Sequence, residues 1–467
     1  MCILSYGSLK TVLQHLEANL RFVLSLHIPS IRVTEKLVPL KIETLHFKDV
    51  KVEFGENVMF AGTVHVNDTQ YSISVYHDIT QIPESVRIEQ KFGRGFSVDF
   101  DRFGFRDHTG DDIVTPGDLN LRDPTVVRAA VPDPANNEQR IQEFELRVKI
   151  VQEKLKYLED NGSFLRSRKR SPFNEYIKLF LNGEFEIVTA NVETIKEAIL
   201  HLECWIDEKT ADIQPFYRRR DNQPPPYTSY LCLDIGEGRR IEVLQYQKKI
   251  HEAKKYLIGK LLGDRCDPIQ IKKLMLDDDQ VIQLPLGVKF NVQGMLCSGG
   301  LQKTYDALKP VLTESPLQQL VAYIENEEEL ELPILKHAKH LFILGNHLLI
   351  DDYWKLQNLT IRKLKENDRF MVADFVRFIK NWVELGRKAG SRVVFGQRYL
   401  NLASKLLPQL EQVYKNAVIG ERSITIPTKS GKEIKVNISG AKWEIYEMNS
   451  GVLPSKDAEF FFKERFP

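Results

Sequence analysis

The sequence predicts a mixed α/β fold of the α+β kind, in which a short three-helix unit is followed by a small β-rich domain and then by alternating strands and helices. Apolar residues at helical spacing predict the helices, and apolar alternation bounded by Gly, Asn and Asp predicts the strands. A strand-like segment also recurs at irregular intervals in the second half of the chain. The 467 residues are enough for several such domains.

The composition limits the class of protein. The chain has 65 Lys and Arg residues against 64 Asp and Glu, a formal net charge of +1. A surface built for nucleic acid or for an anionic membrane is more basic, so we expect neither as a partner. The five cysteines are scattered and form no Cys-x-x-Cys, which indicates neither a disulfide framework nor a zinc ribbon. A reducing compartment, the cytoplasm or the nucleus, fits this pattern best.

The clearest copy of the recurring segment runs from Ala338 to Asn346, with Ala338, Leu341 and Ile343 directed inward. This spacing is typical of the strand of a leucine-rich repeat, whose terminal Asn bonds to neighbouring backbone groups. Any buried strand also shows apolar alternation, so an ordinary sheet remains the alternative. The other copies are Ile271, Leu274, Leu276 and Asp279; Leu317, Leu320, Ala322 and, one place late, Asn326; Leu356, Leu359, Ile361 and Leu364; and, more weakly, Tyr230, Cys232 and Leu233.

Residues 1–40 predict a compact helical unit. Ser8 can cap a helix whose apolar residues fall at i, i+3, i+4 and i+7, and Pro29 ends the second of three helices. Three helices in about 35 residues cannot bury their own leucines, so this stripe needs a partner surface. That surface is either another protein or the domain that follows. The candidate partner-binding residues are Leu9, Val12, Leu13, Leu16, Leu20 and Leu24.

The amino-terminal segment, which reads LSYGSLKTVLQHL, then LRFVLS, then IPSIR, resembles a divergent F-box. With VPLKI at 38–42, FDRFG at 100–104, TPGD at 115–118 and LPLG at 284–287, most of the chain is similar to the nematode-expanded F-box C type family. That family carries a large domain of unknown function behind a short F-box-like start. The chain departs from the usual pattern at Leu4-Ser5, where Leu-Pro is common, and it lacks the common Trp of the third helix.

The resemblance implies a substrate receptor. An F-box binds the Skp-type adaptor of a cullin-RING ubiquitin ligase, and the remainder of such a chain holds a protein target. In this sequence the helices of residues 1–40 would bind the adaptor, and the repeat-like region would bind the target.

The middle of the chain is divided by composition. Residues 41–125 predict a β-rich domain, and residues 136–160 predict an amphipathic helix with a heptad seam. The seam allows a coiled-coil homodimer, but a helix that lies on the adjacent domain is favoured. The seam residues are Ile141, Phe144, Val148, Val151, Leu155 and Leu158.

Residues 161–226 are expected to form a linker and a small insert. Pro224, Pro225 and Tyr227 match the Pro-Pro-x-Tyr pattern that WW domains bind. Tyr227 can equally belong to the next strand, which would bury its ring. The basic cluster at 166–170 resembles a nuclear localisation signal only weakly, because exposed linkers often carry such runs.

Residues 227–420 predict the irregular leucine-rich-repeat-like α/β domain, and residues 421–467 predict carboxyl-terminal strands and a tail. The sequence shows no pattern typical of a catalytic site. His337, His340 and His347 lack the Glu and the i, i+4 spacing of a zinc hydrolase helix. Asp277 to Asp279 lack the glycine-bearing loop of a calcium site. We therefore expect no enzyme, no cofactor and no metal.

The function expected first is that of a substrate-recognition adaptor of a Skp-cullin-F-box type ubiquitin ligase. The alternative is a protein-interaction scaffold without a ubiquitin role, which would bind through the Pro-Pro-x-Tyr linker or the heptad helix. An enzyme of unrecognised type is the third candidate. Substitution of Leu9 and Leu13, or of Tyr227, separates these candidates in a binding assay.

Overall fold

The computed structural model describes residues 6–54, 57–77, 99–107, 110, 113–122, 133–161, 200, 202–203, 205–206, 210, 213–236, 239–278, 280–345, 348–363, 370–387, 390–396, 402–428, 431–439 and 442–448. Several predictions fall outside these residues: the repeat positions Asp279, Asn346 and Leu364, the basic cluster at 166–170, and the tail after residue 448.

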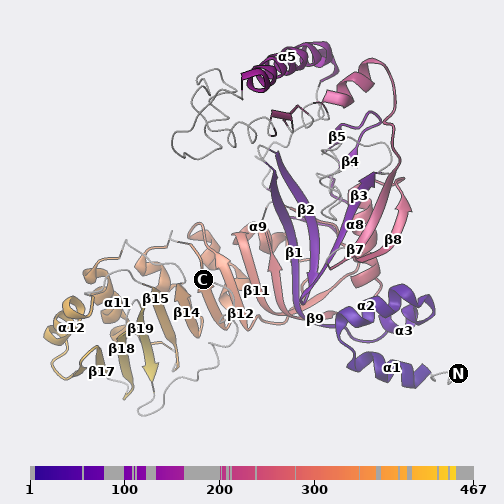
Figure 1. The fold of residues 1–467 in the computed structure, drawn as a ribbon. Helices are drawn as coiled ribbons and strands as arrows, with labels where there is room; N and C mark the ends of the chain where they lie inside the picture. Colours follow the sequence, from indigo (N-terminus) through magenta and orange to yellow (C-terminus); the bar gives the residue numbers. More distant parts are fainter. Residues whose placement is uncertain are drawn as a thin grey trace.

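The described strands form one sheet of 15 strands and two short pairs. The seven middle strands of the sheet are parallel neighbours, and four antiparallel strands continue it at each end (Figure 1). The predicted mixed α/β class is confirmed. In order across the sheet the strands are β16 (Val418–Gly420), β17 (Ser423–Pro427), β18 (Glu433–Ser439), β19 (Lys442–Met448), β15 (Arg392–Gly396), β14 (Thr360–Lys363), β13 (His340–Ile343), β12 (Gln319–Tyr323), β11 (Phe290–Gly300), β9 (Ile269–Leu276), β1 (Lys41–Phe54), β2 (Asn57–Val66), β3 (Thr69–His77), β7 (Ser229–Ile235) and β8 (Arg239–Gln245).

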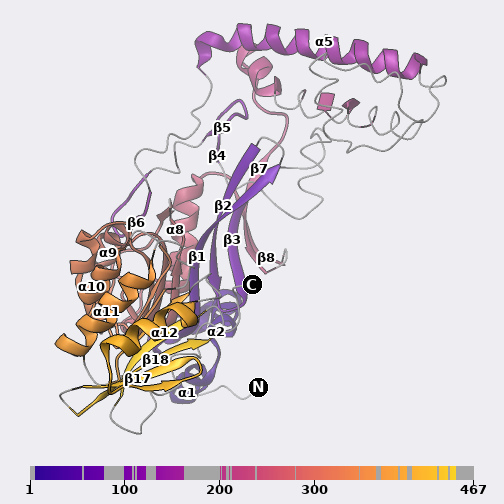
Figure 2. The ribbon, with the colours of Figure 1, turned by 90° about the vertical axis from the view of Figure 1, so that its left-hand side faces the viewer.

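Helices pack against one face of the parallel strands, as the two views in Figures 1 and 2 show. The apolar residues of these helices and of the inner strand positions form one core cluster. Ala18 and Phe22 of the amino-terminal helix α2 (Ala18–His27) also belong to this cluster. The helices of the α/β region that contribute to it are α8 (Ile250–Leu262), α9 (Leu301–Leu308), α10 (Pro333–His337), α11 (Val372–Leu385) and α12 (Leu402–Val413).

The remaining elements are outside the large sheet. The pair β4 (Asp99–Phe100) and β5 (Arg106–Asp107) and the pair β6 (Leu119–Asn120) and β10 (Val281–Ile282) are antiparallel. The other helices are α1 (Tyr6–His15), α2 (Ala18–His27), α3 (Arg32–Lys36) and α5 (Asn137–Asn161), with 3-10 turns η1 (Pro29–Ile31), η4 (Pro134–Asn136), η5 (Glu328–Glu331) and η6 (Ile350–Trp354).

One register column crosses all seven parallel strands and forms the centre of the core. Its side chains alternate with outward ones because successive residues of a strand point to opposite faces. Each of them is at most 1% exposed. The column consists of Leu45, Leu274, Met295, Leu320, Leu341, Ile361 and Val393.

The alignment of the recurring segments is partly correct in register. It placed Leu274, Leu320 and Leu341 in one column, and these three residues do share a column. It did not include β11, which lies between the strands of Leu274 and Leu320. It also placed Leu359 in this column, whereas Ile361, two residues later, pairs with Leu341. That the units are leucine-rich repeats remains a prediction.

The segment at Tyr230 was wrongly included among the recurring segments. It lies in β7, which is antiparallel to both β3 and β8 and is not part of the parallel series. Periodicity alone could not show this, since a buried antiparallel strand carries the same apolar alternation as a parallel one.

The opposite face of the parallel strands is also buried at its middle. The register row next to the core column includes Val321, Phe342 and Val394, which are 1%, 2% and 4% exposed. Leu296 and Arg362 belong to the same row and are half-buried, so the row is accessible in part.

The strands predicted for the β-rich domain are part of the same large sheet. Strand β1 pairs with β2 on one side and with β9 on the other, over Lys41–Phe47 and Gln270–Leu276. Hydrogen bonds therefore connect residues 41–77 directly to the α/β region. Of the strands described for residues 41–125, β4, β5 and β6 lie in the two short pairs and not in the large sheet.

Candidate partner-binding site

The three amino-terminal helices lie against the end of β1–β3, where they project beyond the sheet (Figure 1). The ring of Phe22 meets that of Tyr71 edge to face, with 6.0 Å between centroids. Asn19 donates to the Val66 carbonyl at 3.0 Å and accepts from the Tyr71 hydroxyl at 2.9 Å. These contacts fix α2 on the β2–β3 hairpin.

The hairpin turn itself is shaped to receive α2. Asn67 has a φ of 52°, a left-handed conformation that Asn tolerates better than most residues. Its side-chain oxygen accepts from the amides of Glu43 and Thr44, both at 3.0 Å. Its amide nitrogen donates to Glu17, whose carboxylate also caps α2 by accepting from the amides of Asn19 and Leu20.

A buried ionic cluster joins the helical unit to the α/β region. The Glu35 carboxylate, 1% exposed, lies between Arg21 and Arg265 and accepts from both guanidinium groups at 3.0 to 3.1 Å. Arg21 also donates to the carbonyls of Glu35, Val38 and Pro39. Burial lowers the pKa of Arg21 and of Arg265, while the Glu35 charge opposes that shift.

Lys36 forms the second connection. Its ammonium donates to the carbonyls of Gly259, Lys260 and Gly263 at 3.1, 3.0 and 2.5 Å. These carbonyls belong to the end of α8, where unpaired acceptors and the helix dipole favour a cation. Lys36 therefore acts as a cap on α8 supplied from another part of the chain.

The six residues predicted to bind a partner are not equally accessible. Leu13 is 1% exposed and packs inside the chain, whereas Val12 and Leu20 are 43% and 46% exposed. Leu9, Leu16 and Leu24 are half-buried. Leu13 thus contributes to the interior of the unit and the other five residues contribute to its surface. Whether these residues bind a partner remains a prediction.

Four further apolar residues of the same unit are exposed and were missed by the stripe analysis. Val33 is 72% exposed and Leu37 is 38% exposed, and they are neighbours because the Leu37 amide bonds to the Val33 carbonyl. Val33 and Leu37 have i, i+4 spacing in the sequence. They belong to the third predicted helix, which was not included in the predicted partner-binding stripe. The other two are Tyr6 at 58% and Ile28 at 44%.

The linear motif is in part packed on the chain itself. Pro224 is exposed, but Pro225 and Tyr227 are half-buried. The guanidinium of Arg218 lies 5.6 Å from the centre of the Tyr227 ring, and a Cβ on Gly104 would lie 2.9 Å from the Tyr227 hydroxyl. Burial raises the pKa of Tyr227. A WW domain would have to detach this ring, so the motif remains a prediction.

The predicted heptad seam from Ile141 to Leu158 lies within the long helix α5. Its seam residues Ile141 and Val151 are 1% and 5% exposed. Near its start Asn137 donates to the Phe216 carbonyl at 3.1 Å, and Glu145 accepts from the Tyr217 hydroxyl at 2.8 Å. The helix thus packs on the chain, as the amphipathic-helix interpretation expects, and the homodimer remains a prediction.

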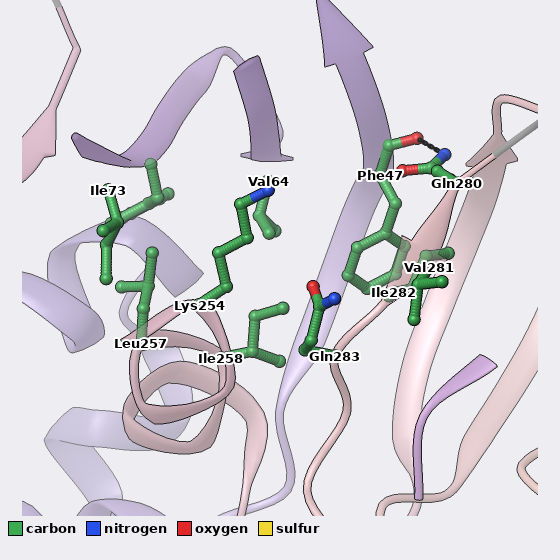
Figure 3. Close-up of a pocket in the computed structure, with 11 residues that line it drawn as sticks. Phe47, Val64, Ile73, Lys254, Leu257, Ile258, Gln280, Val281, Ile282 and Gln283 are labelled. Atoms are coloured by element: carbon green, nitrogen blue, oxygen red, sulfur yellow. Dashed lines mark hydrogen bonds between the residues drawn. The ribbon is translucent and has the colours of Figure 1, made fainter. Parts of the chain in front are cut away.

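Three pockets among the described residues lie beside the large sheet. The first, between β1–β3 and α8, measures about 30 Å³, which is room for about one water. In Figure 3 Lys254 extends along it toward Val64, and Gln280 donates to the Phe47 carbonyl at 3.0 Å. A larger but shallow depression of about 310 Å³ lies at Tyr227 and Tyr246, and an apolar pocket of about 150 Å³ lies beside β8.

The histidines considered as metal ligands are not brought together. His337 ends α10 and is exposed, His340 begins β13 and is half-buried, and His347 lies outside the described residues. In the described part of the chain no group of three or more His, Cys, Asp or Glu could hold a metal ion. No helix in that part is long and apolar enough to cross a membrane.

Comparison with known proteins assigns one segment. Residues 249–398 match the model of a family described as a domain of unknown function, DUF3557. The matched segment begins at the residue before α8 and ends two residues after β15, so it spans α8 and the parallel strands except β1. No curated protein and no solved structure matches the chain.

Proposed function

We propose that the chain is a non-enzymatic substrate-recognition adaptor of a Skp-cullin-F-box type ubiquitin ligase. Its amino-terminal helices bind the Skp-type adaptor, and the α/β region holds a protein target. The role in ubiquitin transfer comes from the resemblance of the amino-terminal segment to an F-box. The observation that carries the proposal is the exposed apolar surface of a rigidly anchored helical unit.

That surface is dense for its size. Six of the 21 exposed large apolar side chains in the described residues lie between Tyr6 and Leu37. Exposed apolar side chains that gather on one small unit mark a site of protein association. A helical partner with an apolar groove or ridge can cover them, which is the chemistry expected of an adaptor that binds F-boxes.

The anchoring supports the same function. A receptor has to hold its target at a fixed position relative to the ligase, so the adaptor-binding unit and the target-binding region must form one body. Glu35 between Arg21 and Arg265, together with Lys36 on the end of α8, provides this coupling. The coupled region is the segment that matches the domain of unknown function.

The test is co-purification of the full chain with a Skp-type adaptor after co-expression. The informative variant is the double substitution Val12→Asp, Val33→Asp, because both side chains are exposed and the fold should tolerate a carboxylate there. Leu13→Asp is unsuitable, since a carboxylate at a buried position unfolds the unit and would abolish binding for a trivial reason.

The matched control is Leu286→Asp with Met371→Asp, two side chains that are each 73% exposed and lie outside the helical unit. We expect capture by the parent chain and by the control, and loss of capture by the Val12, Val33 variant with an unchanged circular dichroism spectrum. Failure of the parent chain to capture the adaptor would overturn the proposal, as would undiminished capture by the variant.

A further inference from the structure

Strand β8 is an open edge of the large sheet. It is the last strand at one end, and among the residues that the structure describes it pairs with β7 alone (Figure 1). An edge strand offers unpaired backbone N–H and C=O groups that another strand can use. At the other end of the sheet β16 has three residues, against seven in β8. The β8 edge is therefore the longer template.

The pairing pattern shows which backbone groups face outward. The Tyr246 amide donates to the Ser229 carbonyl at 3.2 Å, so in an antiparallel ladder the backbone groups of Leu244 also face β7. Those of Val243 and Gln245 face the open side. A register shift opposite Leu233 interrupts the ladder, which confines the regular part of the edge to residues 242–245.

The side chains at this edge are apolar and accessible. Val243 is 52% exposed and Leu244 is 42% exposed, although they are neighbours in sequence and point to opposite faces of the sheet. Natural edge strands usually carry charged residues or Pro to prevent association. Two adjacent exposed apolar residues on an edge strand indicate an edge that is used.

An apolar pocket of about 150 Å³ lies under this edge, between β7, β8 and α8. A cavity of about this volume accommodates a group of benzene size. Leu244 and Tyr256, which is 39% exposed, are at its rim. The residues that line it are Ile73, Leu231, Cys232, Leu233, Glu242, Leu244, Lys248, Ala253 and Tyr256.

The charges beside the pocket favour an acidic partner. Glu242 is paired with Lys260, and Lys249 is paired with Asp107 at 2.9 Å. Lys248 contacts the Tyr256 ring from 5.5 Å and forms no ion pair with a described carboxylate. A carboxylate of the partner can therefore pair with Lys248 at the pocket.

A second copy of this chain does not fit the same edge well. Strand β8 begins with Arg239 and Arg240 and is followed by Lys248 and Lys249. Antiparallel pairing of two β8 strands would bring these like charges together at both ends, which is destabilising.

We propose that β8 binds an extended segment of a partner protein as an added strand, with one bulky apolar side chain of the segment in the pocket beside Leu244 and a nearby Asp or Glu on Lys248. Backbone bonds to Val243 and Gln245 supply affinity, and the pocket and Lys248 select the sequence. The claim that this segment belongs to the target of a ubiquitin ligase rests on the proposed function. The claim that β8 binds an acidic peptide does not.

The test is selection of random heptapeptides displayed on phage against the immobilised full chain, followed by fluorescence polarisation with the selected peptides. We expect peptides with a Leu or Phe close to an Asp or Glu. Val243→Pro removes the outward N–H without a loss of pairing to β7, and it should weaken binding by roughly tenfold or more. Lys248→Glu should weaken the same peptides by a similar factor.

Val243→Ala is the matched control because it shortens the side chain but keeps the N–H, and it should bind within about threefold of the parent chain. Both proline and alanine variants should keep the unfolding midpoint and the capture of the Skp-type adaptor, which separates this site from the amino-terminal helices. The proposal is overturned if no peptides are selected, if they bind Val243→Pro as tightly as the parent, if Lys248→Glu has no effect, or if the selected sequence is that of β8 itself.

Discussion

At the scale of single residues, the most consequential feature is the burial of four charged side chains at one junction. Glu35, Lys36 and Arg21 come from the amino-terminal segment, and Arg265 follows α8. In the sequence these residues look like ordinary surface charges between apolar positions. Arg21 and Glu35 are 14 residues apart, but Glu35 and Arg265 are 230 residues apart, and no local pattern reveals that contact.

Glu35→Gln should lower the free energy of unfolding by about 3 kcal/mol or more, because it leaves two buried guanidinium groups without a compensating charge. Urea unfolding of the full chain measures the change. Glu43→Gln is the matched control, since the Glu43–Lys272 pair is exposed and should contribute less than about 1 kcal/mol. Equal effects of the two substitutions would show that the cluster is not important for stability.

Lys36 should give stability a specific pH dependence. Burial and then the neighbouring Arg265 lower the pKa of Lys36 from 10.5 to about 8. The folded chain therefore binds this proton more weakly than the unfolded chain, so the stability contributed by Lys36 rises with pH across about 8 to 10.5. Relative to Lys36→Met, the free energy of unfolding of the parent should increase by up to about 3 kcal/mol across that window.

Urea unfolding of both proteins at several pH values measures this difference. A difference that stays constant with pH would contradict the lowered pKa of Lys36. It would mean that the three carbonyls at the end of α8 hold the ammonium as well as water does.

At the scale of elements, α11 shows how much periodicity can predict. Phe375, Phe378, Ile379 and Trp382 follow i, i+3, i+4, i+7 spacing, which is typical of one helix face, and all four are buried. Gly386 follows as the carboxyl-terminal cap. The structure adds what these rings contact. Phe378 lies 5.0 Å from Trp354 and 5.8 Å from Phe395, so α11 is held by aromatic contacts to η6 and β15.

Phe378→Ala should lower the free energy of unfolding by about 3–5 kcal/mol, because it opens a cavity among rings that cannot collapse onto it. Thermal unfolding followed by tryptophan fluorescence measures it. Leu385→Ala on the same helix, at a side chain 75% exposed, should change stability by less than about 0.5 kcal/mol. A small effect at Phe378 would contradict the packing of α11 on η6 and β15.

Strand β11 shows why prediction of the other elements failed. Gly294 lies within this strand, where a Cβ would lie 3.2 Å from the Lys272 carbonyl, so glycine permits the close approach of β9. Asn358 likewise has a role that no local pattern predicts. Its amide donates to the carbonyls of Leu335 and Ala338 at 2.8 and 2.6 Å and satisfies a buried turn.

At the scale of the whole molecule, the amino-terminal helices and the α/β region form one connected structure. The stripe of Leu9 to Leu24 was predicted to need a partner surface, either another protein or the following domain. In the structure one side of the helical unit packs on the chain and the other is exposed. Leu13, Ala18 and Phe22 are buried, whereas Val12 and Leu20 are exposed. Sequence spacing could not divide the stripe in this way, because helix packing decides it.

This connection predicts cooperative opening. Native-state hydrogen exchange of the full chain should give the amides of α2 and those of the last turn of α8 the same free energy of opening, and Glu35→Gln should lower both together. Amides of α2 that exchange far more easily than those of α8, without a response to Glu35→Gln, would show that the helical unit opens independently.

The measurement that tests the central claim most directly is isothermal titration calorimetry of the full chain with a Skp-type adaptor, for the parent and for Val33→Asp. Removal of one apolar side chain from the interface and its replacement by a charge should weaken binding by roughly tenfold or more. Binding by the parent that Val33→Asp reduces, while Met371→Asp does not, is the result we predict. No binding by the parent, or equal binding by all three proteins, would contradict the claim that the exposed surface of the amino-terminal helices is a partner site.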